Sequence, residues 1–263
     1  MKPLAALGDD EARRLRGVAF DLDDTLLDRG RLDEAAYSAL FRLREAKLLL
    51  VVSTGRPAGW GEIIQRQWPI DATVTENGAV LFTRRGERVV RIDRLASAER
   101  AARRAELYEL AHEMCARHPE VALADDNDAR ASDVTIDVGE HRSAPPAVIE
   151  ALRMEARARG VRTTVSSVHL HLSRDGDDKA SGILRAVCEL FGEDATAARV
   201  RWAFVGDSGN DAAAFAAFDT TVGVANVRDH LRALTVPPRY VASARAGAGF
   251  AEIAARLTAL RRA

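Results

Sequence analysis

The sequence predicts an α/β protein: a doubly wound core built on a parallel sheet, with a separate α+β module inserted into it. The first 80 residues, and the chain from residue 179 onward, alternate apolar strand segments with helical ones, which is typical of a parallel sheet. Between them the rhythm changes to amphipathic helices and strands of alternating polarity. We therefore expect the core at residues 1–82 and 175–263, and the inserted module at residues 83–174.

The first part of the core repeats a strand-helix pattern. Val18-Ala19-Phe20 and the run from Leu48 to Val52 are continuously apolar, as in strands buried on both faces of a parallel sheet. In order, we expect a strand at 17–22, a helix near 33–46, a strand at 48–53, a helix near 58–67 and a strand near 72–75. Glu76-Asn77-Gly78-Ala79 then breaks the pattern before another strand begins at Val80.

For the inserted module, the sequence predicts two helices packed against an antiparallel sheet. Residues 80–93 fit a charged strand pair, and a helix follows whose apolar face carries Leu107, Leu110, Ala111 and Met114. A strand at 132–138 alternates strictly in polarity, with Val134 on one face and Asp133 on the other. Pro145-Pro146 begins the second helix, Gly160 ends it, and strands near 161–166 and 167–173 complete the module.

From residue 179 the core rhythm returns. Ile183, Leu184, Val187, Leu190 and Phe191 lie on one face of a predicted helix. We expect a strand at 200–205, a helix at 210–218, strands at 220–224 and near 240–243, and a last helix at 249–262.

Composition excludes several classes of protein. The chain has 263 residues, and its net charge of −1 gives no long-range attraction to nucleic acid or to an anionic membrane. The only two cysteines, Cys115 and Cys188, fall in helical patterns, so a disulfide framework is not expected. We find no signal-peptide pattern and no apolar stretch long enough to span a membrane. We therefore expect a cytoplasmic protein with no nucleic-acid or membrane partner; the oligomeric state is left open.

Carboxylates gather where the first strand ends, at Asp21-Leu22-Asp23-Asp24-Thr25. Ligands of open α/β sheets bind at the carboxyl ends of the strands, and acids packed this closely need a cation or a proton to offset their repulsion. Polar segments occupy comparable places later in the chain: Ser53-Thr54-Gly55-Arg56-Pro57 after the second strand, Gly176-Asp177-Asp178-Lys179 before a helix, and Gly206-Asp207-Ser208-Gly209-Asn210-Asp211 after a third buried strand.

These four segments, in this order, resemble the four motifs of the haloacid dehalogenase-like (HAD) phosphohydrolases. The position of the inserted module is similar to that of the large α/β cap of class IIB, whose members include sucrose-phosphate and mannosyl-3-phosphoglycerate phosphatases. The resemblance implies a Rossmann-like core and a cap that sets substrate specificity. One departure is Asp24, where the family often has Gly; Asp tolerates turn conformations better than most residues.

The resemblance implies phosphoryl transfer through an aspartyl-phosphate. Asp21 would be the nucleophile, and Mg²⁺ would be bound by the side chains of Asp21 and Asp207 and by the backbone carbonyl of Asp23. Asp23 would also be the general acid and base, a task favoured by negative charge beside it. Asn210 and Asp211 would support the metal site or Lys179 from behind.

The transferred phosphoryl group needs donors of its own. Thr54 and the backbone of Gly55 would supply directional hydrogen bonds, and Lys179 would add positive charge at the start of a helix. Lys179 is one of only three lysines among 38 basic residues. Ser53 competes for the motif position, and the alternative interpretation of Thr54 is an N-cap of the next helix.

Four residues are candidates for substrate binding: Arg56, Asn77, His169 and His171. The alternatives are a surface salt bridge for Arg56 and turn geometry for Asn77. His169 and His171 share one face of a strand, and that face could line a sugar pocket or lie exposed to solvent. The alternating acids Asp133 and Asp137 present the same choice.

The residues favour a Mg²⁺-dependent phosphomonoester hydrolase acting on a small phosphorylated metabolite. The resemblance alone points to a sugar phosphate. One alternative is a phosphosugar mutase. Another is a non-catalytic phosphate-binding, receiver-like module, although Asp23 argues against it because such a module needs no proton shuttle.

Overall fold

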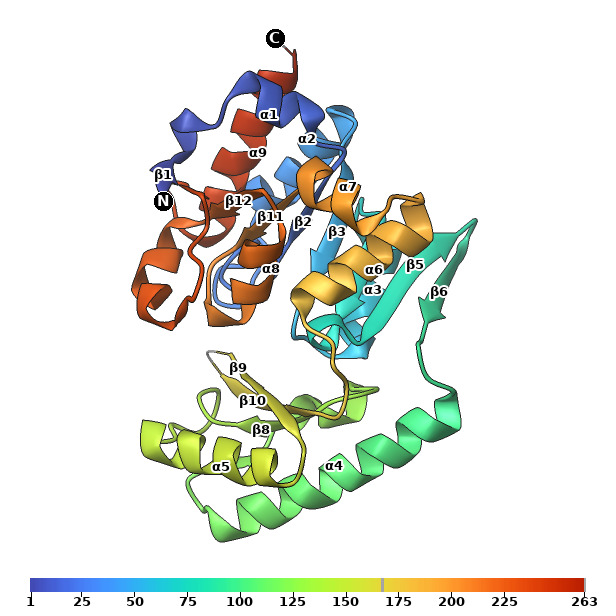
Figure 1. Ribbon diagram of the computed structural model, residues 1–263, viewed down its shortest axis with the longest axis vertical. Helices are drawn as coiled ribbons and strands as arrows, with labels where there is room; N and C mark the ends of the chain where they lie inside the picture. Colours follow the sequence, from blue (N-terminus) through green and yellow to red (C-terminus); the bar gives the residue numbers. More distant parts are fainter. Residues whose placement is uncertain (167, 263) are drawn as a thin grey trace.

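The computed structural model describes residues 1–166 and 168–262 and contains two sheets. The larger has nine strands in the order β1 (Lys2–Pro3), β13 (Tyr240–Val241), β12 (Thr220–Gly223), β11 (Trp202–Gly206), β2 (Gly17–Phe20), β3 (Leu49–Ser53), β4 (Ala72–Thr75), β5 (Val80–Arg85) and β6 (Arg88–Ile92). Pairing is parallel from β1 through β4, and β5 and β6 add an antiparallel edge. Figure 1 shows this core above a smaller module, with the C-terminus at the far end of the core and the N-terminus at its side.

Helices cover both faces of the core sheet, as continuous apolar strands require. On β2, Val18 and Phe20 face one apolar cluster while Ala19 faces the other. The first face is covered by α1 (Asp9–Arg14), α2 (Glu34–Glu45), α3 (Ala58–Gln67) and α9 (Ala246–Arg262), and the second by α6 (Lys179–Phe191), α7 (Ala195–Arg201) and α8 (Ala212–Ala217). The predicted doubly wound core is therefore present.

The inserted module, hereafter the cap, is an antiparallel sheet with helices on one face. Its strands run in the order β7 (Ala122–Leu123), β8 (Val134–Asp137), β10 (His169–Ser173) and β9 (Arg162–Val165). Apolar side chains of α4 (Ser97–Arg117) and α5 (Pro146–Ala158) pack on the face that carries Val134 and Leu170. The opposite face carries the polar residues of the alternating strands, and it is turned toward the core (Figure 1).

The sheet pairing corrects the predicted domain boundary. Residues 83–92 were assigned to the module, but β5 and β6 pair with β4 and belong to the core sheet. Their charged, half-exposed pattern is that of an edge hairpin, which sequence alone does not distinguish from a strand pair of the module. We propose that the cap comprises residues 93–174.

Other differences are local. Helix α7 replaces the beginning of the predicted strand at 200–205, because Asp194 accepts hydrogen bonds from the N–H groups of Thr196 and Ala197 and begins a helix there. The N-terminal elements β1 and α1 were not predicted, nor was the 3₁₀ segment η5 (Ala225–Ala233). Of the predicted strand at 167–173, residue 167 lies outside the described residues.

Two expectations about the whole chain can be compared with the described residues. Cys115 and Cys188 are both free thiols. Within residues 1–166 and 168–262, every helix is too short or too polar to cross a membrane.

Candidate active site

Four adjacent parallel strands end at the edge of the core that faces the cap. Asp21 follows β2, Thr54 follows β3, Asp207 follows β11, and Asn226 lies just beyond β12. Because carboxyl ends of parallel strands share one edge, residues far apart in sequence are brought together there.

Lys179 connects the first and last predicted motifs. Its Nζ lies 2.7 Å from Asp21 Oδ1 and 2.6 Å from Asp211 Oδ1, and it donates to Asn210 Oδ1 at 3.2 Å. The ammonium is fully buried, and although burial opposes its charge, the two aspartates raise the pKa of Lys179. A capping box at Asp178 fixes the start of α6 and so the base of this side chain.

Three carboxylates surround one region of space suited to a cation. Oxygens of Asp21, Asp207 and Asp211 lie within 4.8 Å of one another, and all three residues are buried. Burial raises the pKa of Asp21 to about 7 although Lys179 opposes it, and burial followed by the charges of Asp211 and Asp21 raises the pKa of Asp207 to about 9. One lysine does not offset three buried acids, so an all-oxygen donor set with excess negative charge fits Mg²⁺.

The hydrogen bonds of Asp211 distinguish it from the other two acids. Its Oδ1 contacts Lys179, and its Oδ2 accepts from the N–H groups of Asp207 and Ser208 at 2.8 and 3.1 Å. Any side chain at position 206 would clash with Asp211, since a Cβ on Gly206 would lie 2.4 Å from Asp211 Oδ2. Both oxygens of Asp211 are thus engaged by the protein, which suits support of Lys179 and of the Asp207 loop.

Asp207 is held by two residues to which the sequence analysis gave no role. Thr25 Oγ1 donates to Asp207 Oδ1 at 2.9 Å, and Asn226 Nδ2 donates to Asp207 Oδ2 at 2.9 Å. Asn226 also donates to the carbonyl of Asp24, whose φ of 56° lies in the left-handed region. This is a backbone conformation that Gly adopts without strain.

Asp23 contacts a cation rather than the carboxylates expected beside it. The Arg56 guanidinium donates to both oxygens of Asp23 over 2.6 to 3.2 Å and stacks 4.3 Å from the Trp60 ring centre. Burial lowers the pKa of Arg56, but the hydrogen bonds and charge of Asp23 outweigh it and raise that pKa overall. The predicted salt bridge of Arg56 therefore exists, but it lies inside the site.

The turn after β3 carries Thr54 and Gly55. Thr54 is fully buried, and its Oγ1 accepts from the N–H of Arg56 at 3.0 Å. The N-cap of α3 is Pro57, so the alternative interpretation of Thr54 as that cap is wrong. Ser53 Oγ is buried without a hydrogen-bond partner among the described residues.

Asn77 lies against this turn. Its backbone is left-handed, with φ of 52°, and its N–H donates to the Thr54 carbonyl at 3.1 Å. Its buried side-chain amide finds no partner among the described residues, and its Oδ1 is 3.2 Å from the place of a Cβ on Gly55. Turn geometry thus accounts for its backbone, while the unsatisfied amide remains available to a ligand.

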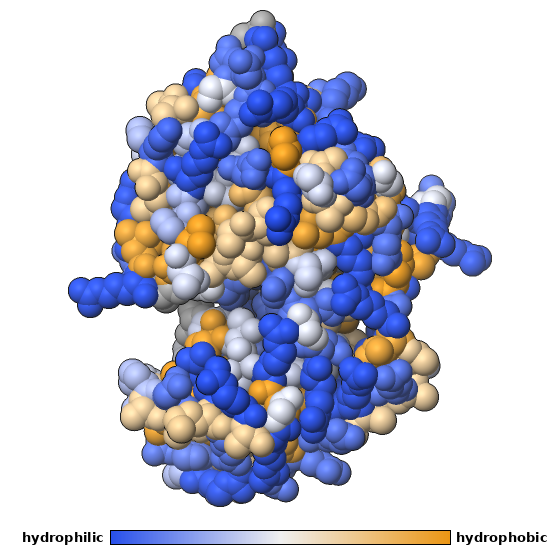
Figure 2. Space-filling view, viewed as in Figure 1, coloured by the Kyte–Doolittle hydropathy of each residue, from blue (hydrophilic) through white to orange (hydrophobic). Residues whose placement is uncertain are grey.

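Core and cap enclose a cavity of about 670 Å³ at this edge. Figure 2 shows the hollow between the two parts. The lining includes these predicted residues: Asp21, Asp23, Gly55, Arg56, His169, His171, Asp207 and Asn210. Lys179 and Asp211 reach it through contacts with Asp21 and Asp207, whereas Thr54 and Asn77 lie behind Gly55.

The polar face of the cap is buried, so its interpretation as a solvent-exposed face is wrong. His169 Nε2 contacts Glu140 Oε2 at 2.9 Å, and His171 Nδ1 contacts Asp133 Oδ2 at 2.9 Å. His171 is 3% exposed, and burial lowers its pKa in spite of Asp133. Asp137 accepts instead from backbone N–H groups of the following turn.

Several site residues were not found from the sequence. Asn226 had a usable signal, since it is a polar residue just after a buried strand. Glu140 and Trp60 had none, because the first follows a cap strand of unknown orientation and the second lies in an amphipathic helix. Arg130, which lines the cavity from the cap, was one of 35 arginines and had no distinguishing pattern.

Comparison with known proteins finds a matching family model. Residues 18–127 match the model of a family described as haloacid dehalogenase-like hydrolase. Over this stretch, which is less than half of the chain, the protein is similar to haloacid dehalogenase-like hydrolases. The predicted resemblance to this superfamily and the prediction of an enzyme are therefore confirmed. No curated protein sequence matches the chain.

Solved structures confirm the predicted fold of the chain. A Thermoplasma acidophilum protein is 20% identical with a TM-score of 0.74, over 92% of this chain and 98% of that one. The sucrose-phosphatase of Synechocystis sp. PCC6803, solved with sucrose and phosphate, is 18% identical with a TM-score of 0.68, over 93% and 98% of the chains. A HAD subclass IIB sugar phosphatase is 17% identical with a TM-score of 0.61, over 86% and 93%. A Rossmann-like core with an inserted α+β cap is thus shown.

Proposed function

We propose that this protein is a Mg²⁺-dependent phosphomonoester hydrolase of the HAD type that works through an aspartyl-phosphate on Asp21. The observation that carries the proposal is the contact of Lys179 with Asp21 among three buried carboxylates beside the cavity between core and cap. The side chains of Asp21 and Asp207 and the carbonyl of Asp23 would hold Mg²⁺. When bound, the ion would supply positive charge between the nucleophile and the phosphate.

The proposed reaction has two displacements. An oxygen of Asp21 forms a bond to phosphorus as the ester P–O bond breaks, and Asp23 gives a proton to the departing alkoxide. Asp23 then takes a proton from a water molecule whose oxygen attacks phosphorus. The bond between phosphorus and the Asp21 oxygen breaks, which releases inorganic phosphate. Lys179, Thr54 and the Gly55 backbone would bind the phosphoryl oxygens in both steps.

The substrate class we propose is a small sugar phosphate. The cavity lining includes Glu140, Ser166 and His169, groups suited to hydroxyl recognition, and Trp60, against whose ring Arg56 stacks. Two of the similar structures are described as sugar phosphatases, one of them holding sucrose and phosphate. The cytoplasmic location and the lack of nucleic-acid and membrane partners stay predictions from the sequence.

The test is phosphate release from a panel of sugar phosphates and other phosphorylated metabolites, with Mg²⁺ and with chelator. We expect release that requires Mg²⁺ and is abolished in Asp21→Asn. An isomerised sugar phosphate without free phosphate would instead indicate a mutase. Binding of phosphate without any turnover would indicate a non-catalytic module.

A further inference from the structure

The cap contacts the phosphate-binding side of the core through residues 130–133, which we call the docking segment. This segment lies between the 3₁₀ turn at Asp125–Ala129 and strand β8. Two core elements receive it: Glu76, which follows β4, and the turn Thr54–Arg56, which follows β3. The contact thus reaches the turn to which we assign phosphate binding.

Glu76 binds the backbone of the docking segment. Its Oε1 accepts from the N–H of Ala131 at 2.8 Å, and its Oε2 accepts from the N–H groups of Ser132 and Asp133 at 2.6 and 3.0 Å. The same carboxylate accepts from the N–H of Ala58 at the start of α3. Glu76 is 3% exposed and has φ of 50°, so a buried acid with a strained backbone lies where core and cap meet.

Arg130 joins the docking segment to Gly55. Its Nη1 donates to the Gly55 carbonyl at 3.1 Å and to Asp133 at 2.9 and 3.1 Å, while Nε and Nη2 donate to Asp126. The side chain is 1% exposed. Because two cap acids fix the guanidinium plane, the donor aimed at Gly55 has a defined position.

A second cap group presses on the same glycine. The Cε1 atom of His171 lies 3.3 Å from the place of a Cβ on Gly55, and Asp133 holds that ring through Nδ1. Gly55 is therefore bounded by the Arg130 hydrogen bond and the His171 ring. Both groups depend on Asp133 of the docking segment.

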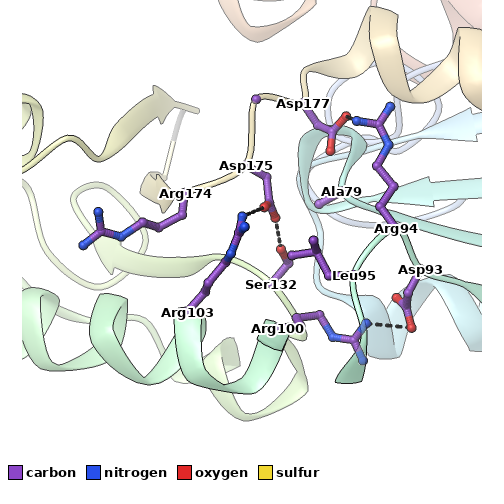
Figure 3. A pocket seen from close by; sticks show the side chains of 11 residues that line it. Ala79, Asp93, Arg94, Leu95, Arg100, Arg103, Ser132, Arg174, Asp175 and Asp177 are labelled. Atoms are coloured by element: carbon purple, nitrogen blue, oxygen red, sulfur yellow. Dashed lines mark hydrogen bonds and ion pairs between the residues drawn. The ribbon is translucent and has the colours of Figure 1, made fainter. Parts of the chain in front are cut away.

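The hinge beneath the segment reinforces this arrangement. Ser132 Oγ donates to Asp175 at 2.5 Å, and Arg94 of the outgoing linker pairs with Asp177 of the returning one at 2.7 Å (Figure 3). Arg100 and Arg103 in the same cavity of about 220 Å³ also face acids, Asp93 and Asp175. The charges there are matched to one another, so we assign this cavity to the hinge and not to a second ligand.

We propose that Arg130 is a positioning residue for the phosphate-binding turn and that Glu76 holds it there by fixing the docking segment. The inference rests on the proposed function. A cap lifted from the core would lose the Arg130 bond to Gly55 and the contact of His171, so a formed phosphate site requires a docked cap. By linkage, phosphate bound at the site must in turn stabilise docking.

The test uses inorganic phosphate in the presence of Mg²⁺, with the full chain. Phosphate affinity is measured by calorimetry, and hydrogen exchange is followed at the amides of Ala131 to Asp133 with and without phosphate. The variants are Glu76→Gln, measured at about pH 8, where the wild-type carboxylate is ionised and the Gln NH₂ would instead face the N–H donors, and Arg130→Lys, which keeps the charge but not the planar guanidinium. The control is Arg104→Met, because Arg104 donates to the Asn127 carbonyl within the cap.

We expect phosphate to slow exchange of these amides in wild type. Both variants should bind phosphate on the order of tenfold more weakly, as loss of about one hydrogen bond predicts, and should lose the exchange response. The control should keep the wild-type phosphate affinity and the wild-type exchange response. A Tm drop with unchanged phosphate affinity and unchanged exchange response would overturn the proposal and leave a structural role only.

Phosphate release by the same proteins separates this inference from the proposed function. Wild-type turnover with phosphate affinity insensitive to Glu76→Gln and Arg130→Lys overturns the positioning role alone. A wild-type protein that neither hydrolyses the ester panel nor binds phosphate overturns both.

Discussion

Arg56 holds both carboxylate oxygens of Asp23, the residue to which we assign proton transfer. The two N–H donors of the planar Arg56 guanidinium fix the orientation of the carboxylate, and stacking on Trp60 fixes the guanidinium. Arg56 thus serves the proposed acid and base directly, a role different from the substrate contact suggested by the sequence.

The first prediction is that Arg56→Lys lowers kcat by about tenfold, because a single ammonium cannot hold both oxygens. Asp23→Asn should keep the fold and lower kcat by about a hundredfold or more. Steady-state kinetics on the best substrate of the panel checks both. The matched control is Arg66→Lys, since Arg66 donates its own fork to Glu62 on the surface. Wild-type kcat in Arg56→Lys would show that the fork does not matter.

The second prediction concerns Thr25. Thr25→Val keeps the shape of a fully buried side chain but removes the donor to Asp207. We expect the Mg²⁺ concentration for half-maximal activity to rise about tenfold or more, as for other partners of metal ligands. Thr258→Val is the control, because among the described residues Thr258 Oγ1 donates to carbonyls of its own helix alone. Equal Mg²⁺ dependence in the two variants would contradict this role.

A third prediction follows from the burial of Lys179. Lys179→Met should lower kcat by about a hundredfold or more, since it removes the cation beside Asp21 and Asp211. Lys179→Arg should not restore activity, because no space surrounds a fully buried ammonium for a larger group. Lys47→Met, on an exposed turn of the core, should retain wild-type kinetics. If Lys179→Arg were nearly as active as wild type, the site would accept a group larger than the Lys179 ammonium, and the prediction would be wrong.

Much of the core site was predictable because its motifs follow apolar strands. Asp21, Thr54 and Asp207 each end such a run, and parallel strands bring their ends to one edge whatever the details of packing. The same rule covers Asn226, which was overlooked because no motif marked it. Local patterning therefore predicts which residues reach the edge, while resemblance supplied their proposed roles.

The junction of core and cap could not be predicted in this way. Glu76 looked like part of a turn, and Arg130 followed a run of acids without any periodic signal. The partners that join core and cap are backbone groups of segments 50 or more residues away, such as the Gly55 carbonyl and the Ser132 N–H. Side-chain type says nothing about such contacts, which depend on how one domain rests on the other.

The last prediction is a pH dependence of stability from Glu76. Burial, followed by the charge of Asp133, raises the pKa of Glu76 from 4.5 to about 7, so the folded chain keeps a proton there that the unfolded chain has lost. The stability contributed by this group is complete below about pH 4.5 and is lost as the pH rises to about 7. The pKa of Asp133 is lowered, chiefly by Arg130 acting against burial, so it stays ionised in this window. The free energy of unfolding in urea should therefore fall between pH 5 and 8 by on the order of 2–3 kcal/mol more in wild type than in Glu76→Gln. Parallel pH profiles for the two proteins would mean that Glu76 is ionised throughout and that its backbone donors outweigh its burial.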